Sequence, residues 1–199
     1  MRTNGYMPLF KRAPSLILDL DCLAFLGLPN EADILSWASN VGGIVLTGHL
    51  HWYSSRSAVH NGSMNVVVFY TLPVFTIEFS YFFQQNIAPW MMGFIVLQGD
   101  TPRPALQIGY SPPYLTKCAK KDTFLCVSNA SSGGDQWNTV RVTHNDSDTP
   151  KTKFYNNGVL ATLSNDNISL SVVGGKFWVS CHSLIYLTSV KMWDGVVIP

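Results

Sequence analysis

Two histidines spaced two residues apart are the first residues here whose types suggest chemistry. His49 and His51 lie in a run typical of a β-strand, and this spacing puts both imidazoles on one face of the strand. With a third ligand such as His60, such a pair can hold a transition metal. The favoured interpretation is different: the histidines form the polar side of a strand whose other side, with Leu50 and Trp52, is apolar.

The carboxylates lack the pairing that glycoside hydrolysis requires. The chain has two glutamates, Glu31 and Glu78, which are far apart in sequence and outside any motif that places two carboxylates across a sugar. Glu78 is expected on a solvated outer face or in a subunit contact. No G-x-S-x-G elbow and no reactive-cysteine signature is present. We therefore predict no catalytic residues and no enzymatic activity, with a divergent glycoside hydrolase as the least favoured alternative.

Metal-binding patterns are also weak. The densest group of loop oxygens is at residues 145–148, where calcium binding is an alternative to an ordinary solvated turn, which is favoured. No cofactor and no metal site is predicted. The four cysteines lack a C-x-x-C spacing, so we expect neither zinc nor disulfide bonds. They are Cys22, Cys118, Cys126 and Cys181.

Loop aromatics supply a candidate binding surface. Sugar binding needs exposed aromatic planes with polar groups beside them. The candidate carbohydrate-binding residues are Trp90, Arg103, Tyr110 and Tyr114, and the adjacent pair Trp52 and Tyr53 is a further platform. Tryptophan and tyrosine equally anchor protein interfaces, for which Phe82 and Trp193 are the candidates. Both uses stay open, with assembly slightly favoured.

The elements that must position these residues are β-strands. Strict alternation over 74–83 puts Phe75, Ile77 and Phe79 on one face, and we expect these residues to be buried between two sheets together with Val140 and Val142. Other strand-like runs cover 64–70, 91–97, 105–110, 123–128, 137–144, 168–173 and 182–193.

Turn and helix signals complete the predicted architecture. The sequence Asn-Asn-Gly at 156–158 predicts a tight turn within a hairpin over 152–163. A capping asparagine followed by acidic residues predicts a short helix over 30–38. The prediction is an all-β, antiparallel β-sandwich with at most one or two short helices, forming a single domain over 15–199 after an N-terminal extension over 1–14.

Three groups of segments follow one another in a characteristic order and spacing. They are 16–21 with 34–37 and 39–43; 66–69 with 72–73 and 75–79; and 137–142 with 154–160 and 185–193. Together they resemble the concanavalin A-like lectin and laminin-G-like jelly-roll superfamily, of the kind found in phage virion and bacterial surface proteins. The resemblance implies a jelly roll. The segments 49–60 and 103–121 depart from the pattern.

Composition bounds the function. Hydrophobic residues make up 47% and charged residues 13%, about half the roughly 25% charge of ordinary domains. Burial against copies of itself or other proteins is therefore expected. A net charge of +1 disfavours nucleic-acid binding, and neither a signal peptide nor a membrane span is predicted.

The superfamily resemblance and this low charge together set the favoured function. It is a non-enzymatic structural or adhesive module of a virion, of the phage decoration, head-fibre or tail-fibre type. The module would be assembled in the host cytoplasm and act through oligomer or capsid contacts, with binding of a cell-surface glycan as a further use. The alternative is a free-standing, lectin-like carbohydrate-binding protein.

Overall fold

A computed structural model describes residues 12–69, 72–83, 95–98, 104–111, 114–120, 123–127, 135–161, 175–181 and 185–199. Within these ranges the chain forms fourteen strands, all paired antiparallel, and two short 3₁₀ helices. The strands are β1 (Leu16–Asp21), β2 (Ala32–Ala38), β3 (Val45–Tyr53), β4 (Ala58–Phe69), β5 (Val74–Phe83), β6 (Ile95–Gln98), β7 (Pro104–Ser111), β8 (Tyr114–Lys120), β9 (Thr123–Val127), β10 (Gln136–Asn145), β11 (Thr152–Asn156), β12 (Val159–Leu160), β13 (Gly175–Cys181) and β14 (Ile185–Trp193). The 3₁₀ helices are η1 (Cys22–Phe25) and η2 (Ser54–Arg56).

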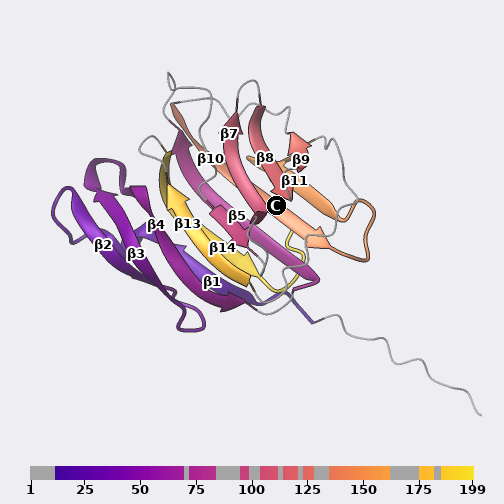
Figure 1. Cartoon of the computed structure of the whole chain (residues 1–199), viewed down its shortest axis with the longest axis horizontal. Coiled ribbons are helices and arrows are strands. Elements are labelled where there is room, and N and C mark those ends of the chain that lie inside the picture. The colour runs from indigo at the N-terminus through magenta and orange to yellow at the C-terminus, as the bar shows by residue number, and fades with distance from the viewer. Residues whose placement is uncertain are drawn as a thin grey trace, which may run out of the picture.

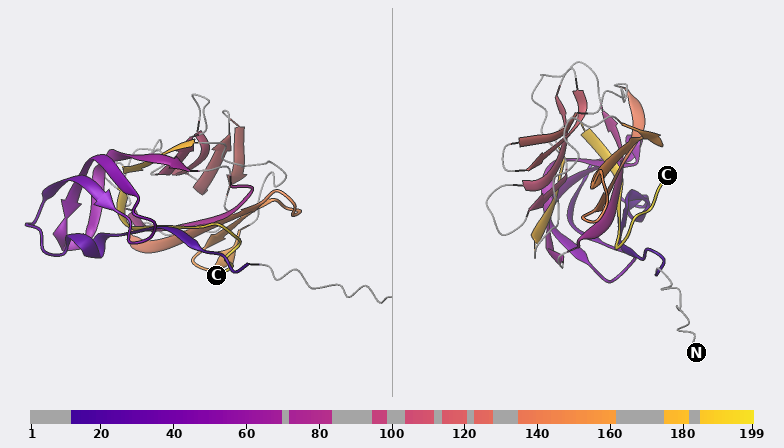
Figure 2. Two further views of the ribbon diagram at one scale, coloured as in Figure 1. Left: turned by 90° about the horizontal axis from the view of Figure 1, so that it is seen from below. Right: turned by 90° about the vertical axis from the view of Figure 1, so that its right-hand side faces the viewer.

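The strands form two layers of one hydrogen-bonded network. The first layer has the order β12-β11-β10-β5-β14-β1, and the second has the order β2-β3-β4-β13-β6-β7-β8-β9. The layers join where Val59 of β4 pairs with Leu187 of β14. The left view of Figure 2 shows one layer above the other, with β2 and β3 at one end. The prediction of an all-β sandwich is confirmed.

The core lies between the layers and contains the residues predicted for it. Phe75, Ile77 and Phe79 are completely buried, and Val140 and Val142 are at most 1% exposed. Register explains the match, because Val140 is opposite Phe79, and Val142 is opposite Ile77, on the neighbouring strand. Each such side chain stabilises the fold by about 1.5–3 kcal/mol through burial.

The predicted helix over 30–38 is wrong, because this segment contains strand β2. Glu31 has a φ of +58°, which no right-handed helix accommodates, and the chain turns there before pairing with β3. A register shift between Ile34 and Ser36 allows both Ile34 and Trp37 to reach the core. The rings of Phe25 in η1 and Trp37 lie 5.3 Å apart. Burial of two large side chains outweighs the local helix signal.

The predicted tight turn is confirmed between β11 and β12. Asn157 and Gly158 have φ values of +48° and +81°, the left-handed pair that a type I′ hairpin turn requires. The Asn157 side chain also accepts a hydrogen bond from the backbone N–H of Thr139, and the Asn157 N–H donates to the Thr139 carbonyl. The turn is therefore anchored to β10.

The segment after β14 folds back over the outer face of β5. The Thr76 hydroxyl donates to the carbonyl of Gly195 and accepts from the N–H of Val197, at 2.7 and 2.9 Å. Asp194 is tied to Ser15 by backbone and side-chain hydrogen bonds. The described part of the chain contains no helix long and apolar enough to cross a membrane.

The predicted state of the cysteines is tested at one position. Cys22 is buried and is not in a disulfide bond, as expected. Its thiol donates to the carbonyl of Leu187 at 3.2 Å. The structure places Cys118, Cys126 and Cys181 in β8, β9 and β13 but does not describe their side chains.

Candidate ligand-binding site

The side chains of the four sugar-binding residues predicted from loops lie outside the part of the chain that the structure describes. Trp90 and Arg103 lie outside the described residues. Tyr110 belongs to β7 and Tyr114 to β8, and the pairing of Ser111 with Tyr114 places both tyrosines at the turn end of this hairpin. Their side chains lie outside the described residues, so these four assignments stay predictions.

Strand β3 separates its polar and apolar side chains as expected. Leu50 and Trp52 are at most 1% exposed in the core. His49 and His51 share the opposite face, and Nε2 of His49 and Nδ1 of His51 lie 3.4 and 3.3 Å from one Asp33 oxygen. The predicted Trp52–Tyr53 platform is wrong, because neighbouring residues of a strand point to opposite faces and Trp52 points inward.

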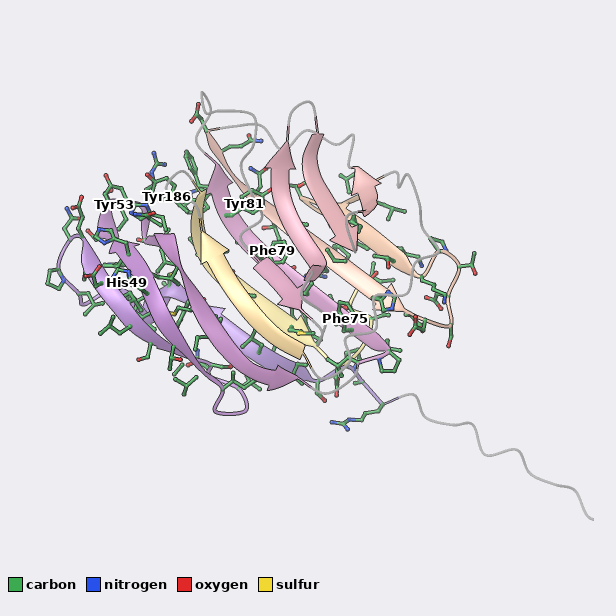
Figure 3. The ribbon with its side chains drawn as sticks, viewed as in Figure 1. His49, Tyr53, Phe75, Phe79, Tyr81 and Tyr186 are labelled. Carbon is green, nitrogen blue, oxygen red and sulfur yellow. The ribbon has the colours of Figure 1, made fainter. Side chains whose placement is uncertain are left out.

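Rings from five strands meet on the outer face, at one end of the sandwich. The group, which we call the aromatic cluster, consists of Tyr53 (β3), His60 (β4), Phe82 (β5), Trp137 (β10) and Tyr186 (β14). Figure 3 shows Tyr53 and Tyr186 close together at this end, whereas Phe75, Phe79 and Tyr81 follow β5. The cluster is separate from the main core.

Strand register explains why these rings meet. Phe82 is directly opposite Trp137 on one side and directly opposite Tyr186 on the other. Because all three point to the same face of the sheet, they form one cross-strand row. Tyr53 is paired with Ala58 at the start of β4, and the small alanine side chain lies in the same apolar group as Phe82 and Tyr186.

Ring geometry makes the row continuous. The centroids of Trp137 and Phe82 are 5.5 Å apart, and those of Phe82 and Tyr186 are 6.1 Å apart, both edge to face. Tyr186 stacks on His60 at 5.0 Å and lies 5.7 Å from Tyr53. These are favourable aromatic separations. Trp137 is 46% exposed, so it presents an open face to solvent.

Arg56 lies over the middle of the row. Its guanidinium carbon is 4.0 Å from the centroid of Phe82 and 4.7 Å from that of Tyr186, within the range of cation–π attraction. Arg56 ends helix η2, and Ser57 then turns the chain with a φ of +47°. The expectation that Phe82 is an exposed interface residue is corrected here: it is only 8% exposed because Arg56, Tyr186 and Trp137 surround it.

The other end of this face is ionic. Glu78 lies on the outer face as predicted, but the expectation that it is solvated is wrong, because its side chain is only 16% exposed. Arg141 donates to it from Nε at 2.7 Å and from a second nitrogen. The Arg141 guanidinium lies 5.7 Å from the ring of Trp193, which is half-buried. The proposed interface role of Trp193 stays a prediction.

Residues 145–148 form a hydrogen-bonded turn. The Asn145 side chain accepts from the N–H of Ser147 and donates to Asp148 at 2.9 Å. Asp146 contacts the buried His144 at 3.2 Å and Lys151 at 3.8 Å. These contacts fit the favoured interpretation of an ordinary turn. Within the described ranges, no three His, Cys, Asp or Glu side chains gather as a metal site would require.

Neither the models of known protein families nor the curated proteins match this chain. Solved structures do match. Trypanosoma rangeli sialidase in complex with sialic acid is 11% identical with a TM-score of 0.63, over 92% of this chain and 31% of that one. The binding domain of botulinum neurotoxin serotype D is 10% identical with a TM-score of 0.62, over 92% and 49%. The receptor binding domain of the mosaic serotype C/D is 14% identical with a TM-score of 0.59, over 92% and 48%.

The likeness is one of fold. The match with β-rich proteins supports the sandwich architecture, and the jelly-roll superfamily itself stays a prediction. Because this chain spans only a third to a half of these proteins, their activities are not transferred to it. The sequence indicated Tyr53 and Phe82 but missed Arg56, Trp137 and Tyr186. The sequence did contain a signal for the cluster, since Phe82 lies near the end of the predicted strand 74–83 and Trp137 lies at the start of the predicted strand 137–144.

Proposed function

We propose that this chain is a non-enzymatic, carbohydrate-binding β-sandwich module whose sugar-binding surface is the aromatic cluster with Arg56. The observation that carries the proposal is the row of rings in direct cross-strand register, with a half-exposed tryptophan at one end and a guanidinium laid over its middle. An aromatic plane contacts the apolar face of a sugar, while nearby donors bind its hydroxyls.

Rigid placement favours this use of the surface. All five rings come from strands, and Phe82 and Tyr186 are held at 8% exposure beneath Arg56. A surface built in this way loses little conformational entropy when a ligand binds. Because the contact area is small, this low entropic cost is needed for measurable affinity. The imidazole of His51 lies beside the cluster, with its ring centroid 5.2 Å from that of His60.

The structural neighbours support a β-sandwich binding module. One is a sialidase with bound sialic acid, and another is a toxin receptor binding domain. These are properties of those proteins; the shared β-sandwich is compatible with a binding module, whose function resides in the site residues of this chain.

A glycan array probed with the purified chain tests the proposal. At least one class of glycan should bind, and calorimetric titration should reproduce the binding in solution. A double variant, Tyr53→Ala with Trp137→Ala, should lose it. Leu160→Ala is the matched control, since Leu160 is 56% exposed on β12, away from the cluster, and should bind normally. Absence of binding to every glycan, or undiminished binding by the double variant, contradicts the proposal.

A second candidate function is assembly, for which we propose a virion as the setting. Three exposed leucines favour it: Leu23, Leu26 and Leu35 are 65, 59 and 66% exposed near η1 and on edge strand β2. Charged residues that usually protect such surfaces are scarce in this chain. Sedimentation at micromolar concentration should show an oligomer that Leu35→Lys weakens. A monomer at all concentrations that also fails to bind virion proteins argues against assembly.

A further inference from the structure

We infer that the ligand of the aromatic cluster is an acidic saccharide, whose carboxylate or sulfate group binds Arg56 while a sugar ring covers Trp137. This inference rests on the proposed function and adds the chemical class of the ligand. Arg56 and Trp137 both contact the ring of Phe82, with distances of 4.0 Å from the guanidinium carbon and 5.5 Å between centroids. A single saccharide unit can therefore contact both side chains.

The positive charge of Arg56 has no carboxylate partner in the described structure. Its guanidinium carbon lies near the centroids of Phe82 and Tyr186, and no carboxylate among the residues that the structure describes forms an ion pair with it. Because these two rings are inclined by 70° to each other, the guanidinium cannot lie flat on both, and its planar fork of five N–H donors exceeds what the ring contacts occupy. That planar fork matches the two oxygens of a carboxylate or sulfate.

Arg141 provides the contrast on the same face. It also lies near an aromatic ring, that of Trp193, but its donors are taken by Glu78. Arg141 is therefore a structural cation, whereas Arg56 holds a positive charge in place without a fixed partner in the described structure. The attraction of aromatic rings for a cation is weaker than a charge-assisted, bidentate hydrogen-bonded pair with an anion.

A carboxylate lies at the end of the cluster that is away from Trp137. Asp33 is the acidic residue at its histidine end, and one of its oxygens already contacts both His49 and His51. An anionic group is therefore directed to Arg56 rather than to the histidine end, where the Asp33 carboxylate would repel it.

Matched pairs of acidic and neutral glycans test the inference. The probes are 3′-sialyllactose with lactose, for a carboxylate, and a sulfated disaccharide with its unsulfated form. We expect the protein to bind the acidic member of at least one pair ten times more tightly or better. Raising the salt concentration should reduce the difference.

Variants assign the preference to one side chain. Arg56→Gln should abolish it while leaving residual binding of the neutral sugar, and Arg56→Lys should restore part of it because the charge returns without the fork. Arg12→Gln is the control, since Arg12 is 81% exposed outside the cluster. Circular dichroism and thermal unfolding establish that each variant is folded.

The outcomes separate the inference from the proposed function. Equal binding of acidic and neutral members, or a preference that survives Arg56→Gln, overturns the acidic ligand while the carbohydrate-binding function stands. Binding of no glycan overturns both. If anions of every kind bind, including sulfated proteins without sugars, the inference that the ligand is a saccharide is overturned, and Arg56 is only an anion site.

Discussion

Replacing Trp137 with alanine should weaken glycan binding by a predictable amount. Tryptophan buries about 150–250 Å² when fully covered, and Trp137 is 46% exposed, so its open part is about 100 Å². At about 25 cal/mol per Å², complete coverage of that part is worth about 2.5 kcal/mol. A sugar covers one face only, which leaves about 1–1.5 kcal/mol, or a five- to twelvefold rise in Kd.

Stability and binding can be separated in this experiment. Trp137→Ala removes the edge-to-face contact with Phe82 and the burial of about half of the indole, which together cost about 3–4 kcal/mol of unfolding free energy, less than the roughly 5–15 kcal/mol of a typical domain. The assay is calorimetric titration of the folded variant with the strongest glycan from the array. Trp137→Phe should lie between the wild type and the alanine variant. A Kd within twofold of the wild type for Trp137→Ala would refute the reasoning.

Three further predictions concern the scaffold and are measured by chemical denaturation. Glu78→Gln should cost about 1–3 kcal/mol, because it leaves the mostly buried Arg141 uncompensated; strictly additive effects in a double-mutant cycle with Arg141→Gln would argue against a coupled pair. Gly62→Ala should cost well above the roughly 1 kcal/mol of Gly158→Ala, because a Cβ at Gly62 meets the His49 carbonyl oxygen whereas at Gly158 it meets nothing; equal losses would contradict this. Phe79→Ala should cost about 3–5 kcal/mol by opening a cavity between the layers, and a cost below about 1 kcal/mol would mean that the core is misassigned.

Regular alternation carried the successful part of the sequence prediction. In β5 every second side chain is apolar, so one face of the strand must pack in the core. This explains the burial of Phe75, Ile77 and Phe79 without knowledge of the strands that pair with β5. The Asn-Asn-Gly turn succeeded for a similar local reason, since few sequences accept two consecutive left-handed residues. Both features depend on residues close together in the chain.

The failures have tertiary causes. The segment over 30–38 has a helix-like start, but pairing with β3 and burial of Ile34 and Trp37 determine its conformation. From β5 alone Glu78 is expected at the surface, and only the folded structure brings Arg141 to its carboxylate and the C-terminal segment to Thr76 on the same face. Long-range packing, which composition does not reveal, decided both cases.

The aromatic cluster shows which part of a site sequence reasoning can reach. The alternation of side chains along a strand could have separated Trp52 from Tyr53 in the sequence, because neighbouring residues of a strand face opposite ways. The row from Trp137 through Phe82 to Tyr186 requires the order β10-β5-β14, in which no two neighbours are consecutive in the chain. The position of Arg56 depends on a short 3₁₀ helix that no pattern in the sequence predicts.

A crystal structure with the strongest glycan from the array tests the central claim most directly. The proposal predicts a sugar ring on the open face of Trp137 with an anionic group at the guanidinium of Arg56. Figure 1 shows β7 and β8 on the other side of the molecule from β2 and β3, and four strands separate β3 from β8 in the sheet. A glycan bound instead at the turn between Tyr110 and Tyr114 would contradict the assignment of the aromatic cluster as the binding site.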